Sequence, residues 1–327
     1  MAAIVAEQLV KHFAPDIRAV DGIDLSIEDG QIFGFLGQNG SGKTTTVRML
    51  TTLLVPTSGR AAVGGFDVIR QAAEVRAAAG VALQEAGLDE LQTGRELLTL
   101  QGRLFGMGGD ALKARVQELL RIVDLEEAAD RRLGGYSGGM QRRLDLAAAL
   151  VHSPRIIFLD EPTTGLDPVS RESVWRYVQD LNRSQGVTIF LTTQYLEEAD
   201  RLAGEVAIID AGKIVAQGSP AELKASIGSD VLTVTVEGGD EAAQRALALF
   251  AAAETMTDAR IVDGAVVIYT KDGARAVPQV VRMLDEAGLV AAEISVARPT
   301  LDDVFLRKTG HHLEADAAVP GREKEAN

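Results

Sequence analysis

The stretch Gly37-Gln38-Asn39-Gly40-Ser41-Gly42-Lys43-Thr44 separates an apolar run at residues 32–36 from a helix-like run that begins at residue 45. The apolar run has the length of a buried strand. Glycines let backbone N–H groups turn inward around a phosphate, and the start of the following helix adds a partial positive charge. The stretch therefore predicts a phosphate-binding loop rather than a glycine-rich turn with a chance Lys-Thr pair.

The side chains of this loop have distinct expected tasks. Lys43 is predicted to reach the β- and γ-phosphates of a nucleotide, and the hydroxyl of Thr44 to hold Mg²⁺. Phe13, upstream of the loop, fits either stacking on an adenine ring or packing in the core. The predicted nucleotide contacts of the loop are Gly37, Asn39, Gly40, Ser41, Gly42, Lys43, Thr44 and Thr45.

A second buried-strand pattern, at residues 155–159, ends in two adjacent carboxylates, Asp160 and Glu161. Ionised carboxylates at the end of a buried strand are costly unless they pair with a cation. Asp160 is therefore predicted to hold Mg²⁺, and Glu161 to polarise the water that attacks the terminal phosphate.

A second helix start lies at Ser137-Gly138-Gly139-Met140-Gln141. It also offers N–H groups and a helix dipole to an anion. Because the loop at residues 37–44 already surrounds one face of a terminal phosphate, this second element is more useful if it reaches the nucleotide of another molecule.

Composition limits the classes of function. The 327 residues suffice for one large core and a smaller domain, and no apolar run approaches the roughly 18–20 residues that span a bilayer. The first residues show no basic segment followed by an apolar stretch, so no secretory signal is expected. The absence of cysteine excludes disulfides and thiolate chemistry, and the net charge of −14 argues against general affinity for nucleic acid.

Alternating strand-like and helix-like segments predict an α/β domain at residues 1–228, with a parallel sheet and helices on both faces. A mostly helical subdomain is expected at about residues 91–150. The order strand, helix, hairpin, helix, strand then predicts a ferredoxin-like α+β accessory domain at residues 229–310. Residues 311–327 are expected to form a disordered acidic tail.

In the order and spacing of these motifs, residues 4–228 resemble the ATP-binding-cassette (ABC) ATPases. The Ser-Gly-Gly-Met-Gln motif stands 23 residues before Asp160 (137 to 160), which is a specific spacing. The resemblance implies a P-loop NTPase domain of the ABC-ATPase type that uses ATP and Mg²⁺. It also implies a head-to-tail dimer in which Ser137, Gly138 and Gly139 contact the ATP held by the partner.

Further roles follow from the same resemblance. Gln84 is implied to sense Mg²⁺ and the attacking water and to link the site to a membrane partner. Asp167, in Gly165-Leu166-Asp167, lies in the loop implied to carry signals across the dimer and to contact ATP. Phe13 occupies the adenine-stacking position of the family.

Two positions depart from the usual ABC pattern. Gln194 stands where the family usually places a histidine that contacts the γ-phosphate. Its amide can donate a hydrogen bond to a phosphate oxygen but cannot become cationic or relay a proton. Glu161 is therefore the expected base. Tyr136 replaces the more usual leucine at the start of the signature motif.

Three stretches, at residues 136–140, 192–200 and 301–306, resemble the daunorubicin/doxorubicin-resistance branch of the ABC ATPases. This branch implies ATP hydrolysis that powers efflux of drugs or lipophilic compounds through a separate membrane-spanning permease. The expected location is then the cytoplasmic face of the membrane. The alternative is a soluble ABC-type ATPase of an assembly or regulatory complex, without a role in transport.

Several other residues are expected to be structural. Arg142 and Arg143 are interpreted as a solvated or interdomain face, and Trp175 as packing. Asp302 and Asp303 stand at a helix start and are expected to cap it.

Overall fold

The structure is a computed structural model, and it describes residues 2–83, 89–228, 230–251, 253, 258–270 and 272–310. The chain forms two compact units that divide between Ser219 and Pro220, before the boundary expected at residue 228. Helix α8 (Pro220–Ser226) packs on helix α11 (Leu301–Thr309), which places it in the second unit.

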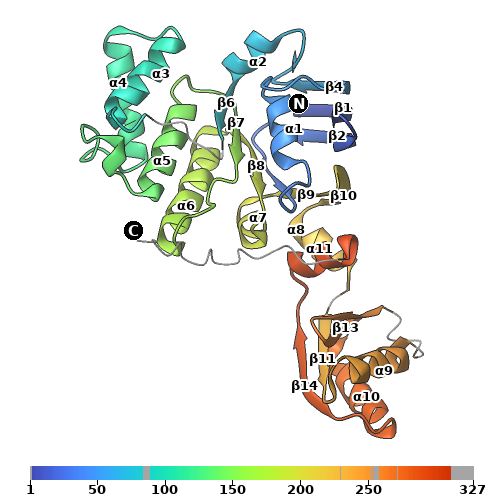
Figure 1. Ribbon diagram of the computed structural model, residues 1–327. Coiled ribbons are helices and arrows are strands. Elements are labelled where there is room, and N and C mark those ends of the chain that lie inside the picture. Colours follow the sequence, from blue (N-terminus) through green and yellow to red (C-terminus); the bar gives the residue numbers. More distant parts are fainter. Residues whose placement is uncertain are drawn as a thin grey trace, which may run out of the picture. The chain divides into compact units, whose positions relative to one another are not determined.

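The first unit is built on a six-stranded sheet with the strand order β10-β9-β3-β8-β7-β6 (Figure 1). Strands β9, β3, β8, β7 and β6 are parallel neighbours, and β10 pairs antiparallel with β9 at one edge. Every residue of β3, β7 and β8 is buried. The bounds are β3 Ile32–Leu36, β6 Ala79–Ala82, β7 Ile156–Asp160, β8 Thr188–Thr193, β9 Glu205–Asp210 and β10 Lys213–Gly218.

Helices cover both faces of this sheet, as predicted. Successive strand residues point to opposite faces. On one face, phenylalanines of β3, β7 and β8 pack with α1 (Lys43–Leu50) and α2 (Ala72–Ala78). On the other face, aliphatic residues of β7 and β8 pack with α5 (Gly138–Ala149) and α6 (Pro168–Gln185), while α7 (Leu196–Leu202) lies against β3.

A second, antiparallel sheet in the same unit was not predicted. Its strand order is β2-β1-β4-β5, with β1 Ala2–Phe13, β2 Ile17–Glu28, β4 Ser58–Val63 and β5 Phe66–Asp67. Strand β2 is followed by β3 after a short turn. The two strands belong to different sheets because β2 pairs along its length with β1. The buried face of this sheet joins the core beneath α1.

The helical segment between β6 and β7 contains α3 (Gly94–Leu104), α4 (Gly109–Ile122) and α5. Helix α3 begins at a capping box, in which the Thr93 side chain accepts from the Glu96 N–H and the Glu96 side chain accepts from the Thr93 N–H. Leucines and valines of the three helices share one buried cluster with α6. Helix α5 packs on β6 and α6, and α3 and α4 pack in turn on α5 (Figure 1).

The second unit has the predicted ferredoxin-like order of elements. Its antiparallel sheet has the order β12-β13-β11-β14, and α9 and α10 share one core with it. The Thr300 and Asp303 side chains form a capping box at the start of α11, which confirms the expected cap for Asp303. The bounds are β11 Asp230–Val236, α9 Gly239–Ala251, β12 Ala259–Val262, β13 Ala265–Thr270, α10 Gly273–Glu286 and β14 Ala291–Ala297.

Candidate active site

The loop at residues 37–42 joins β3 to α1 at the carboxyl edge of the central sheet (Figure 1). Gly42 is the N-cap of α1 with φ +112°, and a Cβ there would lie 2.3 Å from the Ala19 carbonyl oxygen. Gly40 has φ +81° and no atom within 4 Å of the position of a Cβ. The backbone thus needs glycine at Gly42, and the space at Gly40 is open to a ligand.

Lys43 lies inside this loop. Its Nζ donates to the carbonyl oxygens of Gly37 (2.7 Å) and Gln38 (3.0 Å) and lies 3.3 Å from Glu161 Oε1. Burial lowers the pKa of Lys43, and the neighbouring Glu161 carboxylate opposes this shift. The loop therefore holds a buried cation directly beside a buried carboxylate.

Asp160, the last residue of β7, is surrounded by hydroxyl groups. Its Oδ1 accepts from Thr192 Oγ1 of β8 at 2.5 Å and from Thr44 Oγ1 at 3.3 Å. Within the part of the chain that the structure describes, its Oδ2 is buried and has no hydrogen-bond partner. A buried carboxylate oxygen beside a threonine hydroxyl suits a hard divalent cation such as Mg²⁺, which prefers oxygen ligands.

Glu161 has a left-handed backbone conformation, with φ +50°. Its N–H donates to the Thr192 carbonyl oxygen (3.1 Å) and hydroxyl (3.1 Å), and its Oε2 accepts from Thr164 Oγ1 (3.2 Å). A left-handed non-glycine residue costs on the order of 1–3 kcal/mol and is retained where the surroundings enforce it. The turn places this carboxylate against Lys43.

Arg142 does not lie on the solvated or interdomain face predicted for residues 142 and 143, whereas Arg143 is partly exposed. Only 8% of Arg142 is exposed, and its guanidinium donates to backbone carbonyl oxygens beside the carboxylates. Arg142 shares a buried side of α5 with Gly139, Leu146 and Ala149. That helical spacing is the sequence signal that marks Arg142 as an inward-facing residue.

Asp145, one turn after Arg142, is its carboxylate partner. Asp145 Oδ2 accepts from Arg142 Nη1 at 3.2 Å, and both side chains are largely buried. Burial raises the pKa of Asp145 to about 6, and the charge of Arg142 opposes this rise.

Glu198 is a further buried carboxylate that was not predicted from the sequence. Its Oε1 accepts from Trp175 Nε1 (2.9 Å) and from Thr163 Oγ1 (2.9 Å). Burial raises the pKa of Glu198, while hydrogen bonds from Thr193, Trp175 and Thr163 oppose the rise. Trp175 packs as expected and also ties α6 to α7.

The predicted partner-reaching residues lie at two helix starts. Ser137 is the N-cap of α5, and its Oγ accepts from the Met140 N–H at 3.3 Å. Ser137 and Gly138 are exposed, whereas a Cβ on buried Gly139 would lie 2.7 Å from Ser170 Oγ. Asp167 caps α6 by accepting from the N–H groups of Val169 and Ser170 at 3.0 Å each.

The three remaining predicted residues are placed differently. Gln84 lies outside the described residues. Gln194 directly follows β8, is partly exposed, and comes two residues after Thr192. Phe13 ends β1 with 40% of its surface exposed, and Lys11 Nζ lies 5.2 Å from its ring centroid. Phe13 is therefore available to a ligand rather than packed in the core.

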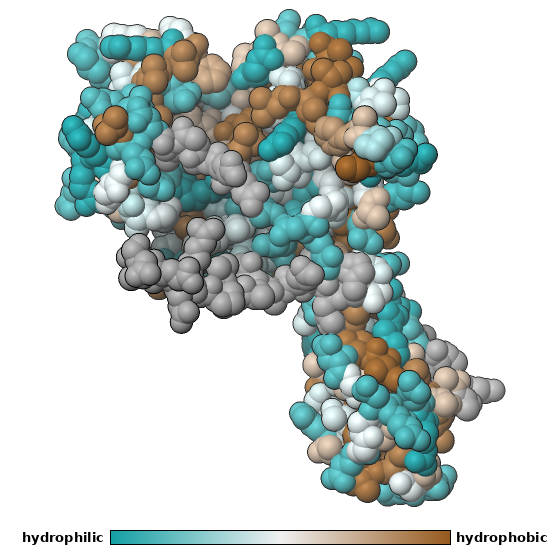
Figure 2. Space-filling model, viewed as in Figure 1, coloured by the Kyte–Doolittle hydropathy of each residue, from teal (hydrophilic) through white to brown (hydrophobic). Residues whose placement is uncertain are grey.

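A groove of about 330 Å³ lies on the first unit beside β6 and α5. Apolar side chains, including Leu53, Val75 and Phe105, line it together with Asp145. Leu53 is 57% and Phe105 42% exposed. Figure 2 shows hydrophobic residues gathered on the face between α3 and α2. This surface is more apolar than an ordinary solvated face.

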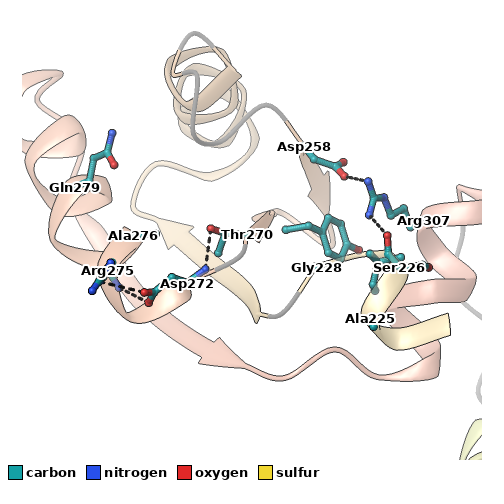
Figure 3. Close-up of a pocket in the computed structure, with 12 residues that line it drawn as sticks. Ala225, Ser226, Gly228, Asp258, Thr270, Asp272, Arg275, Ala276, Gln279 and Arg307 are labelled. Carbon is teal, nitrogen blue, oxygen red and sulfur yellow. Dashed lines mark hydrogen bonds and ion pairs between the residues drawn. The ribbon is translucent and has the colours of Figure 1, made fainter. Parts of the chain in front are cut away.

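A separate cavity of about 650 Å³ lies in the second unit. Figure 3 shows Arg275 directed toward Asp272 and Arg307 toward Asp258. Each of these lining arginines thus pairs with a lining carboxylate, so these four residues carry no net charge. None of the predicted site residues is among the described residues that line this cavity.

Comparisons with known protein families assign both units. Residues 20–164 match the family model described as ABC transporter. Residues 218–309 match the model described as the C-terminal domain of DrrA1-3-like ATP-binding proteins. Daunorubicin resistance ATP-binding protein DrrA2 of Streptomyces coeruleorubidus is 46% identical over 312 residues, 95% of this chain and 96% of that protein.

The chain belongs to the ABC transporter family of ATP-binding proteins. This ABC protein is also 43% identical to Nod factor export ATP-binding protein I of Cupriavidus metallidurans, over 74% of this chain and 78% of that protein. As a member of the family, it binds nucleotide and is an ATPase whose hydrolysis is coupled to transport.

Solved structures support the same assignment for the first unit of the ABC protein. A dimeric bacterial ABC transporter cassette superposes with a TM-score of 0.61 at 26% identity, covering 66% of this chain and 98% of that chain. A dimeric cassette bound to ADP and phosphate gives a TM-score of 0.60 at 25% identity, over 66% of this chain and 98% of that chain. Across the described residues of the ABC protein, no helix combines the length and the apolar character needed to cross a membrane.

Proposed function

We propose that this ABC ATPase is the nucleotide-binding subunit of an exporter that moves drugs or other lipophilic compounds through a separate membrane-spanning permease. It would act at the cytoplasmic face of the membrane. The observation that carries the proposal is the cluster of Lys43, Asp160 and Glu161 at the carboxyl edge of the sheet. The names of the relatives, which include drug-resistance and Nod factor export proteins, favour transport over a soluble assembly ATPase.

The loop and the first carboxylate would hold Mg·ATP. Lys43 and the loop N–H groups would bind the β- and γ-phosphates, Phe13 would stack on adenine, and Thr44 and Asp160 would hold Mg²⁺. The buried, unpartnered Asp160 Oδ2 and the adjacent Thr44 hydroxyl fit that cation. When bound, Mg²⁺ supplies positive charge against the charge that develops on the transferred phosphoryl group.

Glu161 would act as the general base toward the attacking water. In the described arrangement its carboxylate pairs with Lys43, and both side chains are only 3% exposed. Incoming phosphate oxygens would give Lys43 new partners and release Glu161 to accept a proton from water. Lys43 therefore acts as a counter-ion for Glu161 when the loop holds no phosphate, and as a phosphate ligand when it does.

Two glutamines would complete the surroundings of the γ-phosphate. Gln194 would donate its amide N–H to a phosphate oxygen, because it lies two residues after Thr192, which donates to Asp160. Gln84 would sense Mg²⁺ and water, as the family resemblance implies. Neither amide can take up a proton from the attacking water, so proton transfer rests with Glu161.

Two copies would sandwich two ATP molecules head to tail. Ser137 and Gly138 are exposed at the start of α5, so their N–H groups are open to an anion from a second copy. Ser170 joins the starts of α5 and α6, because its hydroxyl donates to Asp167 and lies close to Gly139. The dimeric cassettes among the structural relatives support this arrangement.

The groove beside β6 is the proposed docking site for a short apolar segment of the permease. Leu53 and Phe105 expose large apolar surfaces along it, and such surfaces gain free energy by association. Leu83, which directly precedes Gln84 in the sequence, also lines the groove. A permease segment bound there would contact the chain next to a predicted site residue.

Transport in inside-out membrane vesicles tests the proposal. Vesicles that carry this chain with the permease encoded beside it should accumulate doxorubicin, followed by its fluorescence, only with Mg·ATP. Lys43→Ala should abolish accumulation, and Glu172→Gln, a change in an exposed ion pair with Arg201, should not. If vesicles with Lys43→Ala accumulate as much doxorubicin as vesicles with the wild type, the transport proposal is overturned.

A further inference from the structure

Arg142 connects helix α5 to two other segments at the carboxyl edge of the sheet. Its guanidinium donates to the carbonyl oxygens of Leu83 (2.6 Å), Asp160 (2.8 Å) and Pro162 (2.9 Å). Leu83 follows β6, Asp160 ends β7, and Pro162 follows Glu161. One side chain of the signature helix α5 thus fixes the backbone on both sides of Glu161.

The Arg142 guanidinium needs these contacts because it is a buried cation. An unpaired buried charge costs several kcal/mol, and hydrogen bonds and a counter-charge must offset that cost. The planar guanidinium of arginine donates in fixed directions, so carbonyl groups that satisfy it are held in one arrangement. Arg142 therefore acts as a rigid connector rather than as a flexible surface charge.

Asp145 supplies the counter-charge and faces the groove. Its Oδ2 accepts from Arg142 Nη1 at 3.2 Å, the nitrogen that also donates to the Leu83 carbonyl oxygen. Asp145 and Leu83 both line the groove beside β6. A basic or hydrogen-bonding group in the groove would compete with Arg142 for this carboxylate.

We propose that Arg142 is a positioning residue that holds Asp160 and Glu161 in place, and that Asp145 makes its position respond to a segment bound in the groove. The first half concerns this chain alone. The second half rests on the proposed function, because it takes the permease segment as the occupant of the groove.

Arg143 provides a matched control on the same helix. Its Nη1 donates to the Val123 carbonyl oxygen at 2.9 Å, and its side chain is 21% exposed. It therefore ties α5 to the end of α4 rather than to the sheet. Replacing either arginine by glutamine removes one positive charge from α5, but only Arg142→Gln releases Leu83, Asp160 and Pro162.

The first arm uses the purified chain in three conditions: hydrogen exchange without nucleotide, ATP affinity in EDTA, and ATP turnover with Mg²⁺. Arg142→Gln should speed amide hydrogen exchange at residues 79–83 and 156–163, and Arg143→Gln should not. ATP affinity in EDTA should stay within about twofold, because the phosphate loop is intact. With Mg²⁺, turnover or apparent Mg²⁺ affinity should fall about 10–100-fold, the usual cost of losing a group that orients a metal ligand. Arg142→Lys should restore part of this loss.

Two outcomes of this arm would overturn the positioning role. One is wild-type Mg²⁺ dependence and turnover in Arg142→Gln. The other is an equal loss in Arg143→Gln, which would indicate a general weakening of α5. Thermal unfolding of all three variants identifies a protein that fails to fold, in which case Arg142→Lys alone decides the comparison.

The second arm uses the chain reconstituted with its permease. Asp145→Asn should reduce the ratio of permease-stimulated to basal ATPase rate at least threefold. Leu53→Asp, which places a charge on the apolar groove, tests docking itself. If Leu53→Asp abolishes stimulation and Asp145→Asn leaves the ratio unchanged, the permease docks in the groove but Asp145 does not transmit its binding to Arg142. If neither variant changes the ratio, the proposed docking site falls, while the first arm still decides the role of Arg142.

Discussion

Replacing Glu161 by glutamine should stop turnover while leaving ATP binding intact. Glutamine keeps the size of the side chain but cannot accept the proton of the attacking water. A lost general base lowers a rate about 10²–10⁴-fold. At about 1.4 kcal/mol per tenfold change, this loss is about 3–5.5 kcal/mol in the activation free energy.

The same substitution should change the stability of the nucleotide-free protein. Lys43 Nζ lies 3.3 Å from Glu161 Oε1, a distance at which the gross attraction is about 5 kcal/mol for an effective dielectric constant of about 20. Removing one partner of a buried pair destabilises by about 3–5 kcal/mol. ATP phosphates give Lys43 new partners, so ATP should raise the unfolding temperature of Glu161→Gln more than that of the wild type.

The assay combines ATPase rate, thermal unfolding and gel filtration with Mg·ATP. Glu161→Gln should elute as a stable dimer with little turnover. Glu172→Gln is the control, since Glu172 forms an exposed pair with Arg201, worth about 0–1 kcal/mol. Wild-type turnover in Glu161→Gln would refute the role of Glu161. A variant that stays monomeric with ATP at every concentration would refute the head-to-tail dimer.

Two further predictions concern other residues of the site. Gln194→His should keep or raise turnover, because histidine retains a donor to the γ-phosphate; lost ATP affinity, measured by equilibrium dialysis, would contradict this account of the pocket. Burial raises the pKa of Glu198 in the folded protein above the value of about 4.5 expected in the unfolded chain. As pH rises above about 4.5, the wild type should therefore lose stability relative to Glu198→Gln. The native state then binds more protons than the unfolded state, so wild-type stability falls with rising pH. Urea unfolding of both proteins between pH 4.5 and 7.5 measures the difference, and a difference independent of pH would contradict the assigned shift.

The elements whose pattern lies within one short stretch of sequence were predictable. The loop at residues 37–44, the strand ending at Asp160 and the βαββαβ order of the second unit each follow from local pattern, and the structure has them. The antiparallel sheet of β1, β2, β4 and β5 was not predicted, because strand pairing between distant segments leaves no local signal. Thr192, Arg142 and Glu198 were missed for a related reason. Thr192 bonds Asp160 across 32 residues, Arg142 bonds Leu83 across 59 and Glu198 bonds Thr163 across 35, so only the folded chain brings them together.

The left-handed backbone at Glu161 has a consequence for how this protein evolves. Glycine adopts φ +50° without steric cost, and asparagine tolerates it better than glutamate does. Replacing Glu161 by either residue would relieve about 1–3 kcal/mol of backbone strain, but it would leave Lys43 buried without its carboxylate partner, at a cost of about 3–5 kcal/mol. Selection for stability of the nucleotide-free protein and selection for ATP turnover therefore both favour glutamate at residue 161, despite its strained backbone.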